Sequence, residues 1–526
     1  MNGFATVEIT LPERGALGDA HVCCLANNDV MPLDTRPAFR ADVVGLTARH
    51  PEGMRVLRRS MCFLLAMAVR RVAPEAPFKI MHSAGDGFYF ETDAPFEDEM
   101  RAVVARDLPI DTTVCAYDEA VELFKSSGQS DKLGLLEHIN TPVVCLQRCA
   151  DFTELAQGPL VPRTGMLGVF EIIPEGGGFI MQLPSESDPS AVAGYRPRHA
   201  LMREHREHAE WGRRVGLETV ADLNAAAQSS GIGETIQLCE ALHARNFAKI
   251  ADGIAARSPV PKLVLLAGPS SAGKTTSAKR LGVNLRNNGF RHLMLSADDY
   301  YAGEGKYPLD EDGKPDYEHI EALDLENFNA DLETLLAGRA IKKRVFDFKT
   351  KKPVWNGAEL ALADNGILIV EGIHGLNPAL TPSVPREAKH LVFLSALTQL
   401  GIDSNNVLST SDNRLVRRLV RDHLYRGSSA LRTLGMWGSV RRGEERWIFP
   451  FQENADVSFN TALDYELAVL RPYAEPLLAE VKPKNAEYAT ARRLGKVLGN
   501  FHAITAEKVP ADSLLREYIG GSVFDY

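Results

Sequence analysis

The stretch that decides the fold runs from Leu263 to Thr276 and reads Leu-Val-Leu-Leu-Ala-Gly-Pro-Ser-Ser-Ala-Gly-Lys-Thr-Thr. Five apolar or small residues lead into the pattern Gly-x-x-x-x-Gly-Lys-Thr, and a helix-compatible Ser-Ala-Lys-Arg-Leu follows. This order predicts a buried strand, a glycine loop and a helix, whose backbone N–H groups and helix N-terminus together hold a chain of phosphates. The strand before the loop and the helix after it disfavour the alternative, a glycine-rich turn that binds nothing. We therefore expect the chain to bind a nucleoside triphosphate.

The residues of this glycine loop have separate expected roles. Gly268 and Gly273 leave the backbone free to wrap around an anion, Lys274 reaches the β- and γ-phosphates, and the Thr275 hydroxyl ligates Mg²⁺. The predicted nucleotide-binding residues are Gly268, Ser270, Ser271, Ala272, Gly273, Lys274, Thr275 and Thr276.

Length and composition bound the class of protein. A chain of 526 residues is too long for one ordinary core, so about two to four domains are expected. The net charge of −10 argues against general nucleic-acid adhesion, and seven cysteines without a Cys-x-x-Cys pair indicate free thiols in a reducing compartment. The longest apolar run, Met61 to Val69, is too short for a bilayer span, and the first residues show no secretory signal. We expect a cytoplasmic protein with no membrane partner.

From Lys262 onward, apolar strands alternate with amphipathic helices. This alternation predicts an α/β fold, a parallel sheet with helices on both faces. The expected strands and helices are 263–267, 275–289, 292–296, 325–337, 367–371, 390–395 and 413–425. Before it, the Ser185-to-Pro189 segment reads as a linker, and residues 198–256 read as mostly helical.

Carboxylates follow two of these predicted strands. Asp298 and Asp299 come directly after 292–296, and Glu371 ends the strand that begins near Ile367. Because parallel sheets place reactive groups at the carboxyl ends of their strands, these acids are candidates for holding Mg²⁺ or accepting a proton from an attacking hydroxyl. The alternatives are a helix cap or turn for the aspartates and a solvent-facing acid for Glu371.

Arginines repeat along the predicted helix 413–425. Their spacing of three, four and seven puts Arg414, Arg417, Arg418 and Arg421 on one face. A plain solvated face would mix lysine and glutamate, whereas arginine alone suits planar contact with phosphate and charge neutralisation during phosphoryl transfer.

These features together resemble the uridine kinase / phosphoribulokinase family of P-loop kinases over roughly residues 260–480. The motifs that carry the resemblance are Gly-Pro-Ser-Ser-Ala-Gly-Lys-Thr-Thr, Ser296-Ala-Asp-Asp-Tyr-Tyr301, Ile369-Val-Glu-Gly372 and the arginine helix. The resemblance implies an ATP- and Mg²⁺-dependent kinase in which Asp298 is the catalytic base, with Asp299 left open as the other candidate. It also implies that the helix contributes its arginines to substrate and phosphates from a lid.

The resemblance extends to the residues that would surround the acceptor. It places Glu318 where an aspartate usually holds the sugar hydroxyls, and Phe346 and Lys351 where a tyrosine and a histidine line the base pocket. Pyrimidine specificity therefore does not follow. The predicted catalytic residues are Asp298, Lys274, Arg417 and Arg421; the substrate-binding ones Tyr301, Glu318, Phe346, Lys351 and Arg414; and the Mg²⁺ ligands Thr275, Asp298 and Glu371.

Residues 20–180 resemble a different family, the N-terminal region of threonyl-tRNA synthetases. The matching segments are Arg58 to Ala66, Gly85 to Phe90 and Gly158 to Pro162. In the synthetases, His-x-x-x-His and Cys-x-Gly-Pro-His gather around one editing centre. The corresponding positions here are Arg59, Phe63, Ala156 and Leu160, none of which is a nucleophile, a neutral base or a metal ligand.

We expect Phe63 and Leu160 to fill that pocket instead, so that the scaffold remains without its chemistry. Together the two resemblances suggest a bacterial two-part nucleoside kinase subgroup. The predicted domains are a TGS-like β-grasp unit at 1–52, an α+β editing-like domain at 53–184, a helical linker region at 185–260, the P-loop kinase domain at 261–485 and a C-terminal helical appendage at 486–526.

The expected function is transfer of the γ-phosphate of ATP to a hydroxyl of a small ribose-containing acceptor, with a nucleoside as first candidate. A sugar-phosphate kinase like phosphoribulokinase is the alternative within the same class. An RNA-binding regulatory ATPase, whose front half reads tRNA, is a less favoured alternative because the chain is acidic. The front half as an inert oligomerisation module, and hence a homo-oligomer, also stays open.

Overall fold

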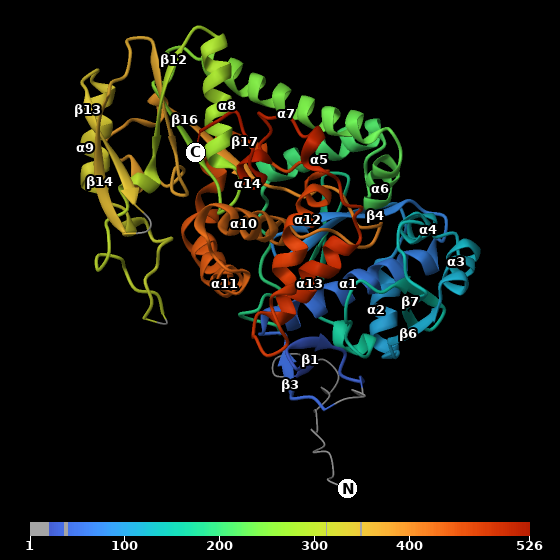
Figure 1. Cartoon of the computed structure of the whole chain (residues 1–526). Helices are drawn as coiled ribbons and strands as arrows, with labels where there is room; N and C mark the ends of the chain where they lie inside the picture. Colours follow the sequence, from blue (N-terminus) through green and yellow to red (C-terminus); the bar gives the residue numbers. More distant parts are fainter. Residues whose placement is uncertain (1–19, 36–39, 312, 348–349, 526) are drawn as a thin grey trace.

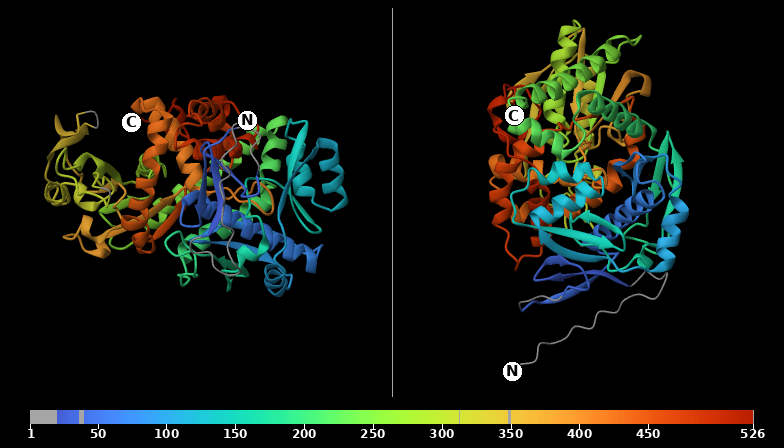
Figure 2. Two further views of the ribbon diagram at one scale, coloured as in Figure 1. Left: turned by 90° about the horizontal axis from the view of Figure 1, so that it is seen from below. Right: turned by 90° about the vertical axis from the view of Figure 1, so that its right-hand side faces the viewer.

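The computed structural model describes residues 20–35, 40–311, 313–347 and 350–525. The predicted β-grasp unit at 1–52 therefore lies partly outside the described residues. Figure 1 shows the two halves of the chain side by side, and Figure 2 shows them from two further directions.

A five-stranded parallel sheet forms the core of the second half. Its order is β12-β15-β11-β16-β17, and every neighbouring pair is parallel. The strands are β11 (Leu263–Ala267), β12 (Arg291–Ser296), β15 (Gly366–Glu371), β16 (Lys389–Ser395) and β17 (Val457–Asn460).

Helices cover both faces of this sheet. Alternate residues of β11 belong to different cores: Val264 packs with α7 (Ile232–Ala255) and α8 (Lys274–Asn287), whereas Leu265 packs with α9 (Leu325–Leu336) on the other face. This alternation is what a strand buried on both sides requires, because successive side chains point to opposite faces. The predicted α/β fold with helices on both faces is confirmed.

An antiparallel hairpin and a helical group complete this half. The hairpin consists of β13 (Ile341–Asp347) and β14 (Lys352–Leu360) and lies at one end of the molecule with α9 (Figure 1). The helical group packs around α10, which contacts α11, α12 and α14. Its helices are α10 (Thr410–Arg426), α11 (Ala430–Trp447), α12 (Glu466–Ala479), α13 (Tyr488–Gly499) and α14 (Arg516–Ile519).

The first half is built around the long helix α1 (Pro51–Val72), which is the centre of its largest hydrophobic cluster. Three antiparallel sheets surround α1, with strand orders β2-β1-β3, β4-β5-β10-β9 and β6-β7-β8. The strands are β1 (His21–Ala26), β2 (Asp29–Met31), β3 (Val43–Thr47), β4 (Phe78–Ala84), β5 (Gly87–Thr92), β6 (Asp111–Ala116), β7 (Val143–Cys149), β8 (Phe152–Leu155), β9 (Glu171–Glu175) and β10 (Gly178–Gln182).

The remaining helices that precede α7 are α2 (Glu97–Arg106), α3 (Tyr117–Ser126), α4 (Ser130–Leu136), α5 (His199–Val215) and α6 (Val220–Gln228). The five predicted domain boundaries remain predictions. The structure adds that α7, which falls inside the predicted linker region, covers one face of the parallel sheet. No helix of the described ranges is long and apolar enough to cross a bilayer.

Buried charges join the two halves. The fully buried Lys132 on α4 lies 2.7 Å from Asp403 and 3.3 Å from Glu154, and the side chain of Asn406 also donates to Glu154. Asp403 and Asn406 belong to the loop before α10, whereas Lys132 and Glu154 belong to the first half. Separating the halves would remove Asp403, the nearest carboxylate partner of this lysine, and breaking a buried ion pair is costly.

Candidate active site

The glycine loop, residues 268–275, fits tightly between β11 and its neighbours. A Cβ at Gly268 would lie 2.3 Å from the Leu394 carbonyl oxygen, so only glycine fits at the end of β11. Gly273 has φ = +74° and precedes α8, a conformation that a residue with a side chain adopts at a cost. Ala272 is fully buried beside them. The loop and the helix N-terminus therefore have the form predicted for a phosphate cradle.

The reactive side chains of the loop face the carboxyl ends of two strands. The Lys274 ammonium donates to the Pro269 carbonyl at 3.2 Å, and the Thr275 hydroxyl donates to Glu371 at 3.4 Å. Ser296, the last residue of β12, also donates to Glu371, at 2.9 Å. Three segments that are far apart in the sequence thus meet at one edge of the sheet, as expected for parallel strands.

Carboxylates and Lys274 converge at this edge. Burial raises the pKa of Glu371 to about 7, and the nearby Asp298 adds to this increase, whereas Lys274 opposes it. Burial likewise raises the pKa of Glu318 to about 7, with Glu444 and Asp298 in the same direction. The predicted residues Asp298, Glu318, Glu371 and Lys274 therefore lie within electrostatic range of one another.

The donor set suits Mg²⁺. Hydroxyl and carboxylate oxygens of Thr275, Glu371 and the adjacent Asp298 are the ligands that Mg²⁺ prefers, and Mg²⁺ usually takes only one or two carboxylates together with substrate phosphates. Within the described ranges, no three His, Cys, Asp or Glu side chains form a ready cage.

The two adjacent aspartates have different surroundings. The Asp299 carboxylate accepts a hydrogen bond from the Phe346 backbone N–H at 3.2 Å, so it ties the end of β12 to β13. Asp298 instead lies near Lys274 and Glu371. The geometry favours Asp298 over Asp299 as the group that faces the reacting atoms.

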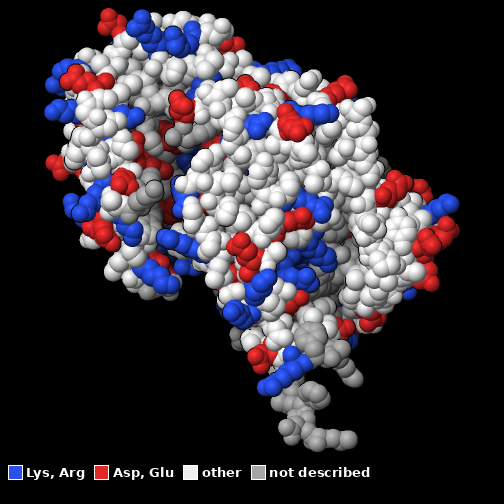
Figure 3. Space-filling view, in the orientation of Figure 1, with Lys and Arg blue, Asp and Glu red and all other residues white. Residues whose placement is uncertain are grey.

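Aromatic side chains line the neighbouring space. The rings of Tyr301 and Phe346 are 5.5 Å apart, and the Tyr301 hydroxyl donates to the Tyr317 carbonyl at 3.1 Å. Lys351 lies in the turn of the β13–β14 hairpin, where it pairs with Glu304 at 3.9 Å. Figure 3 shows a hollow lined by acidic and basic side chains between this hairpin and the α10–α11 pair.

Two arginines of α10 hydrogen-bond to backbone carbonyls of the glycine loop. Arg414 donates to the Ser270 carbonyl at 3.1 Å and pairs with Glu444 at 2.6 Å. Arg417 donates to the Ser271 carbonyl at 3.3 Å and pairs with Glu466. Both guanidinium groups are buried and already neutralised. They orient the loop rather than extend into an open site.

Arg418 and Arg421 lie on the next turn of the same helix. Arg418 donates to the Ser270 hydroxyl at 2.8 Å and lies close enough to lower the pKa of Glu318 against the effect of burial. Arg421 donates to Asp422 at 3.1 Å. The resemblance implied that this helix acts as a lid; in the structure α10 is instead a buried helix of the core, because nearly all residues from Asp412 to Val420 are enclosed by α11, α12 and α14.

The sequence reasoning missed a contribution from the end of the chain. The Glu517 carboxylate accepts hydrogen bonds from the Thr276 hydroxyl at 2.6 Å and the Thr276 N–H at 3.3 Å. The Tyr518 hydroxyl donates to the Ser271 carbonyl at 3.0 Å. Glu517 therefore uses a backbone amide of the kind that a glycine loop offers to phosphate. No local pattern near residue 517 signals this contact, because 241 positions separate the partners.

Two more residues without a predicted role border the site. The Glu444 carboxylate on α11 accepts a hydrogen bond from the Ser270 N–H at 3.0 Å. His374 follows β15, and burial lowers its pKa to about 4, with His319 and Lys274 acting in the same direction. A neutral imidazole is therefore expected there at pH 7.

The four positions that the resemblance matches to the editing centre have different surroundings. Phe63 and Leu160 are almost fully buried, and the Phe63 ring packs edge-on against Phe152 with centroids 5.1 Å apart. The Arg59 guanidinium donates to the Pro159 carbonyl at 3.1 Å. Ala156 lies at the end of β8 and lines the same region.

Comparison with known proteins gives different relatives for the second half of the chain and for its N-terminal region. Residues 263–468 match the model of the Phosphoribulokinase / Uridine kinase family. Among solved structures, similar chains include a possible uridine kinase from Bacillus stearothermophilus, with 19% identity, a TM-score of 0.29, and coverage of 41% of this chain and 98% of that one. A D-glycerate 3-kinase from Cryptococcus neoformans has 15% identity, a TM-score of 0.24, and coverage of 49% and 87%.

The N-terminal region is similar to threonine–tRNA ligases. The ligase of Nitratidesulfovibrio vulgaris is 32% identical over 155 residues, which are 28% of this chain and 24% of the ligase. That of Coxiella burnetii is 35% identical over 138 residues, 24% of this chain and 21% of the ligase. The chain spans about a quarter of the length of these relatives. Residues 263–468 thus form a kinase domain of the Phosphoribulokinase / Uridine kinase family, joined to an amino-terminal region similar to threonyl-tRNA synthetases.

Proposed function

We propose that the chain transfers the γ-phosphate of ATP to a hydroxyl of a small ribose-containing acceptor, with a nucleoside as the first candidate. The observation that carries the proposal is the convergence of Lys274, Asp298, Glu318 and Glu371 at the end of the glycine loop. The family match of residues 263–468 supports phosphoryl transfer as the reaction class.

Asp298 has the role of catalytic base in this proposal. It accepts the proton of the acceptor hydroxyl while the hydroxyl oxygen bonds to the γ-phosphorus and the bond from that phosphorus to the β-phosphate bridging oxygen breaks. ADP leaves with the electrons of the broken bond. Asp299 does not compete for this role, since its carboxylate is engaged by the Phe346 N–H.

The remaining groups position phosphate and neutralise its charge. The loop amides and Lys274 hold the triphosphate, and Thr275, Asp298 and Glu371 supply the oxygens for Mg²⁺. When bound, Mg²⁺ neutralises charge that develops on the phosphate oxygens. Arg417 contributes to catalysis through its hold on Ser271, and Arg421 adds positive charge beside the loop. Arg414 acts in the same way through Ser270.

The acceptor is proposed to bind between Glu318 and the Tyr301–Phe346 pair. Glu318 is suited to ribose hydroxyls, and the aromatic rings to a planar base. Lys351 lies at the outer end of this space. A sugar phosphate is the second candidate acceptor, because Arg418 beside Glu318 can pair with an anionic group.

The decisive experiment measures ADP release with ATP and Mg²⁺ across a panel of ribonucleosides, ribulose 5-phosphate and pantothenate. We expect turnover with at least one ribonucleoside and none with pantothenate. Turnover with ribulose 5-phosphate alone would establish the second candidate, and ADP release that no acceptor stimulates would reject both.

An RNA-binding regulatory ATPase is the less favoured alternative, prompted by the similarity to threonine–tRNA ligases. Because the chain spans only about a quarter of those proteins and has a net charge of −10, we propose no tRNA partner. Filter binding with total tRNA at moderate salt tests this point. Retention of tRNA at micromolar protein would restore the RNA-binding alternative.

A further inference from the structure

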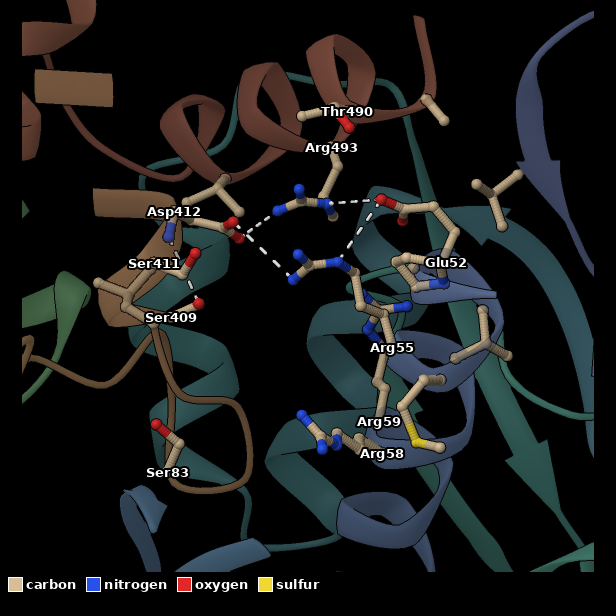
Figure 4. Close-up of a pocket in the computed structure, with 18 of the residues that line it drawn as sticks. Glu52, Arg55, Arg58, Arg59, Ser83, Ser409, Ser411, Asp412, Thr490 and Arg493 are labelled. Atoms are coloured by element: carbon tan, nitrogen blue, oxygen red, sulfur yellow. Dashed lines mark hydrogen bonds and ion pairs between the residues drawn. The ribbon is translucent and has the colours of Figure 1, made fainter. Parts of the chain in front are cut away.

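A large cleft lies between the synthetase-like region and the kinase domain, and it is lined by residues of both. Its volume is about 2170 Å³, and its walls come from α1, the first turn of α10 and α13. Figure 4 shows Arg55 and Arg493 between Glu52 on α1 and Asp412 on α10, with Arg58 and Arg59 on the same side of α1.

Cations outnumber their carboxylate partners in this cleft. Arg55 and Arg493 share two acids: each lies near Glu52, at 3.5 and 3.6 Å, and each also pairs with Asp412. Arg58 has its own partner, Asp86, at 2.7 Å.

Two further cations of the cleft have no carboxylate partner among the described residues. Arg59 donates only to the Pro159 carbonyl, and Lys496 on α13 forms no ion pair. Burial lowers the pKa of Arg59, Glu52 opposes this decrease, and Arg493 and Arg55 add to it. Burial and the charge of Arg59 lower the pKa of Lys496. Figure 3 shows basic side chains gathered over α13. The positive charges of Arg59 and Lys496 repel each other, and an anion bound between them would offset this repulsion.

We propose that this cleft binds a small molecule carrying a phosphate group, held by Arg59 and Lys496 with Arg55 and Arg493 close by. Planar guanidinium groups suit phosphate oxygens, and the cleft is large enough for an organic phosphate ester. A concave site between domains favours a small ligand over a nucleic acid, which would need an exposed basic face.

Helix α10 connects the proposed phosphate site to the glycine loop, so binding at one can affect the other. Asp412 lies in the first turn of this helix, and Arg414 and Arg417, which follow it, donate to the carbonyls of Ser270 and Ser271. An anion that draws Arg55 and Arg493 away from Asp412 changes the ion pairs at the start of the helix. This linkage rests on the proposed kinase function, whereas the binding site itself does not.

Binding is tested on the full chain with a non-hydrolysable ATP analogue and Mg²⁺ filling the glycine loop. Calorimetric titrations with inorganic phosphate, pyrophosphate and a ribonucleoside 5′-monophosphate distinguish the simple anion from the ester. We expect the monophosphate to bind and the R59Q/K496Q variant to bind it at least tenfold more weakly. The matched variant R213Q/K125Q, which removes two exposed cations elsewhere, should bind as the wild type does.

Other outcomes overturn the site. If R59Q/K496Q binds the monophosphate as tightly as the wild type does, the anion binds at another site. Loss of binding whenever the ATP analogue is present would place the anion at the glycine loop. If R59Q/K496Q does not fold, the single variant K496Q is measured instead, and the loss of this one cation should still weaken binding severalfold. Retention of tRNA without binding of any small phosphate would also reject the proposal.

The linkage is tested by measuring KM for ATP at saturating monophosphate. A change of at least twofold that R59Q/K496Q abolishes supports it, and unchanged kinetic constants with a bound monophosphate would overturn it. A chain that binds the monophosphate but phosphorylates no acceptor would reject the proposed function and leave the site in place.

Discussion

The glycine loop and the part of α1 around Arg59 and Phe63 both resemble enzyme sites of known families, but they differ in the side chains that they contain. At the loop, Lys274 and Asp298 lie close to Glu371, whose pKa is raised by burial and by Asp298 and lowered by Lys274. At α1, Phe63 and Leu160, which the resemblance to threonyl-tRNA synthetases matches to the editing centre, are buried apolar side chains. The difference teaches that related scaffolds can carry reactive groups or packed apolar groups, because packing and reactivity depend on different side chains.

The largest effect is expected from replacing the proposed catalytic base of the kinase domain. Asp298→Asn should lower turnover about 10²- to 10⁴-fold, since it removes the proton acceptor, while binding of ATP changes only a few-fold. ADP release and equilibrium binding of an ATP analogue measure the two quantities. Asp299→Asn is the matched control, because an amide oxygen can still accept from the Phe346 N–H. Equal losses in the two variants would remove the base assignment from Asp298.

The second effect tests whether the synthetase-like pocket is a packed core. Phe63→Ala should lower the free energy of unfolding by about 3–5 kcal/mol, because it leaves a cavity beside Phe152. Urea denaturation measures the loss, and kcat of the folded protein should stay within about twofold. A loss below about 1 kcal/mol would show that Phe63 does not fill the pocket.

The third effect uses the raised pKa of Glu371. The carboxyl must be ionised to hold Mg²⁺, so affinity for Mg²⁺ should fall as pH drops below about 7, and by about tenfold at pH 6. Mg²⁺ titrations of ADP release from pH 5.5 to 8 measure this dependence. Glu371→Gln should need more Mg²⁺ at every pH and lose most of the dependence. An unchanged profile in that variant would assign the titration to another group.

The smallest effect concerns the end of the chain. Glu517→Gln should lower KM for ATP a few-fold, at most about tenfold, because phosphate then competes with a neutral side chain for the Thr276 N–H and hydroxyl. Initial rates at varied ATP measure the change. Glu507→Gln, which alters an exposed acid of the same segment, is the control. A raised KM would instead make Glu517 a support of the loop.

Truncation has a structural limit that the linear sequence does not reveal. A chain beginning near Ser258 would lack α7, whose Phe247 and Ile254 cover Val264 on one face of the sheet. A kinase fragment therefore needs to begin before Ile232. Within the intact chain, the buried ion pair of Lys132 with Asp403 also joins the first half to the loop before α10.

The sequence by itself determined the parallel sheet, the glycine loop and the acids at the strand ends, because periodicity and spacing are local properties. It also determined that the four editing positions lack reactive groups. Only the tertiary structure decided what the charged side chains do. Arg414 and Arg417 are neutralised by Glu444 and Glu466, and Glu517 reaches Thr276, because folding brings together partners that lie tens to hundreds of residues apart. Burial and pairing, which set the behaviour of a charge, exist only after that assembly.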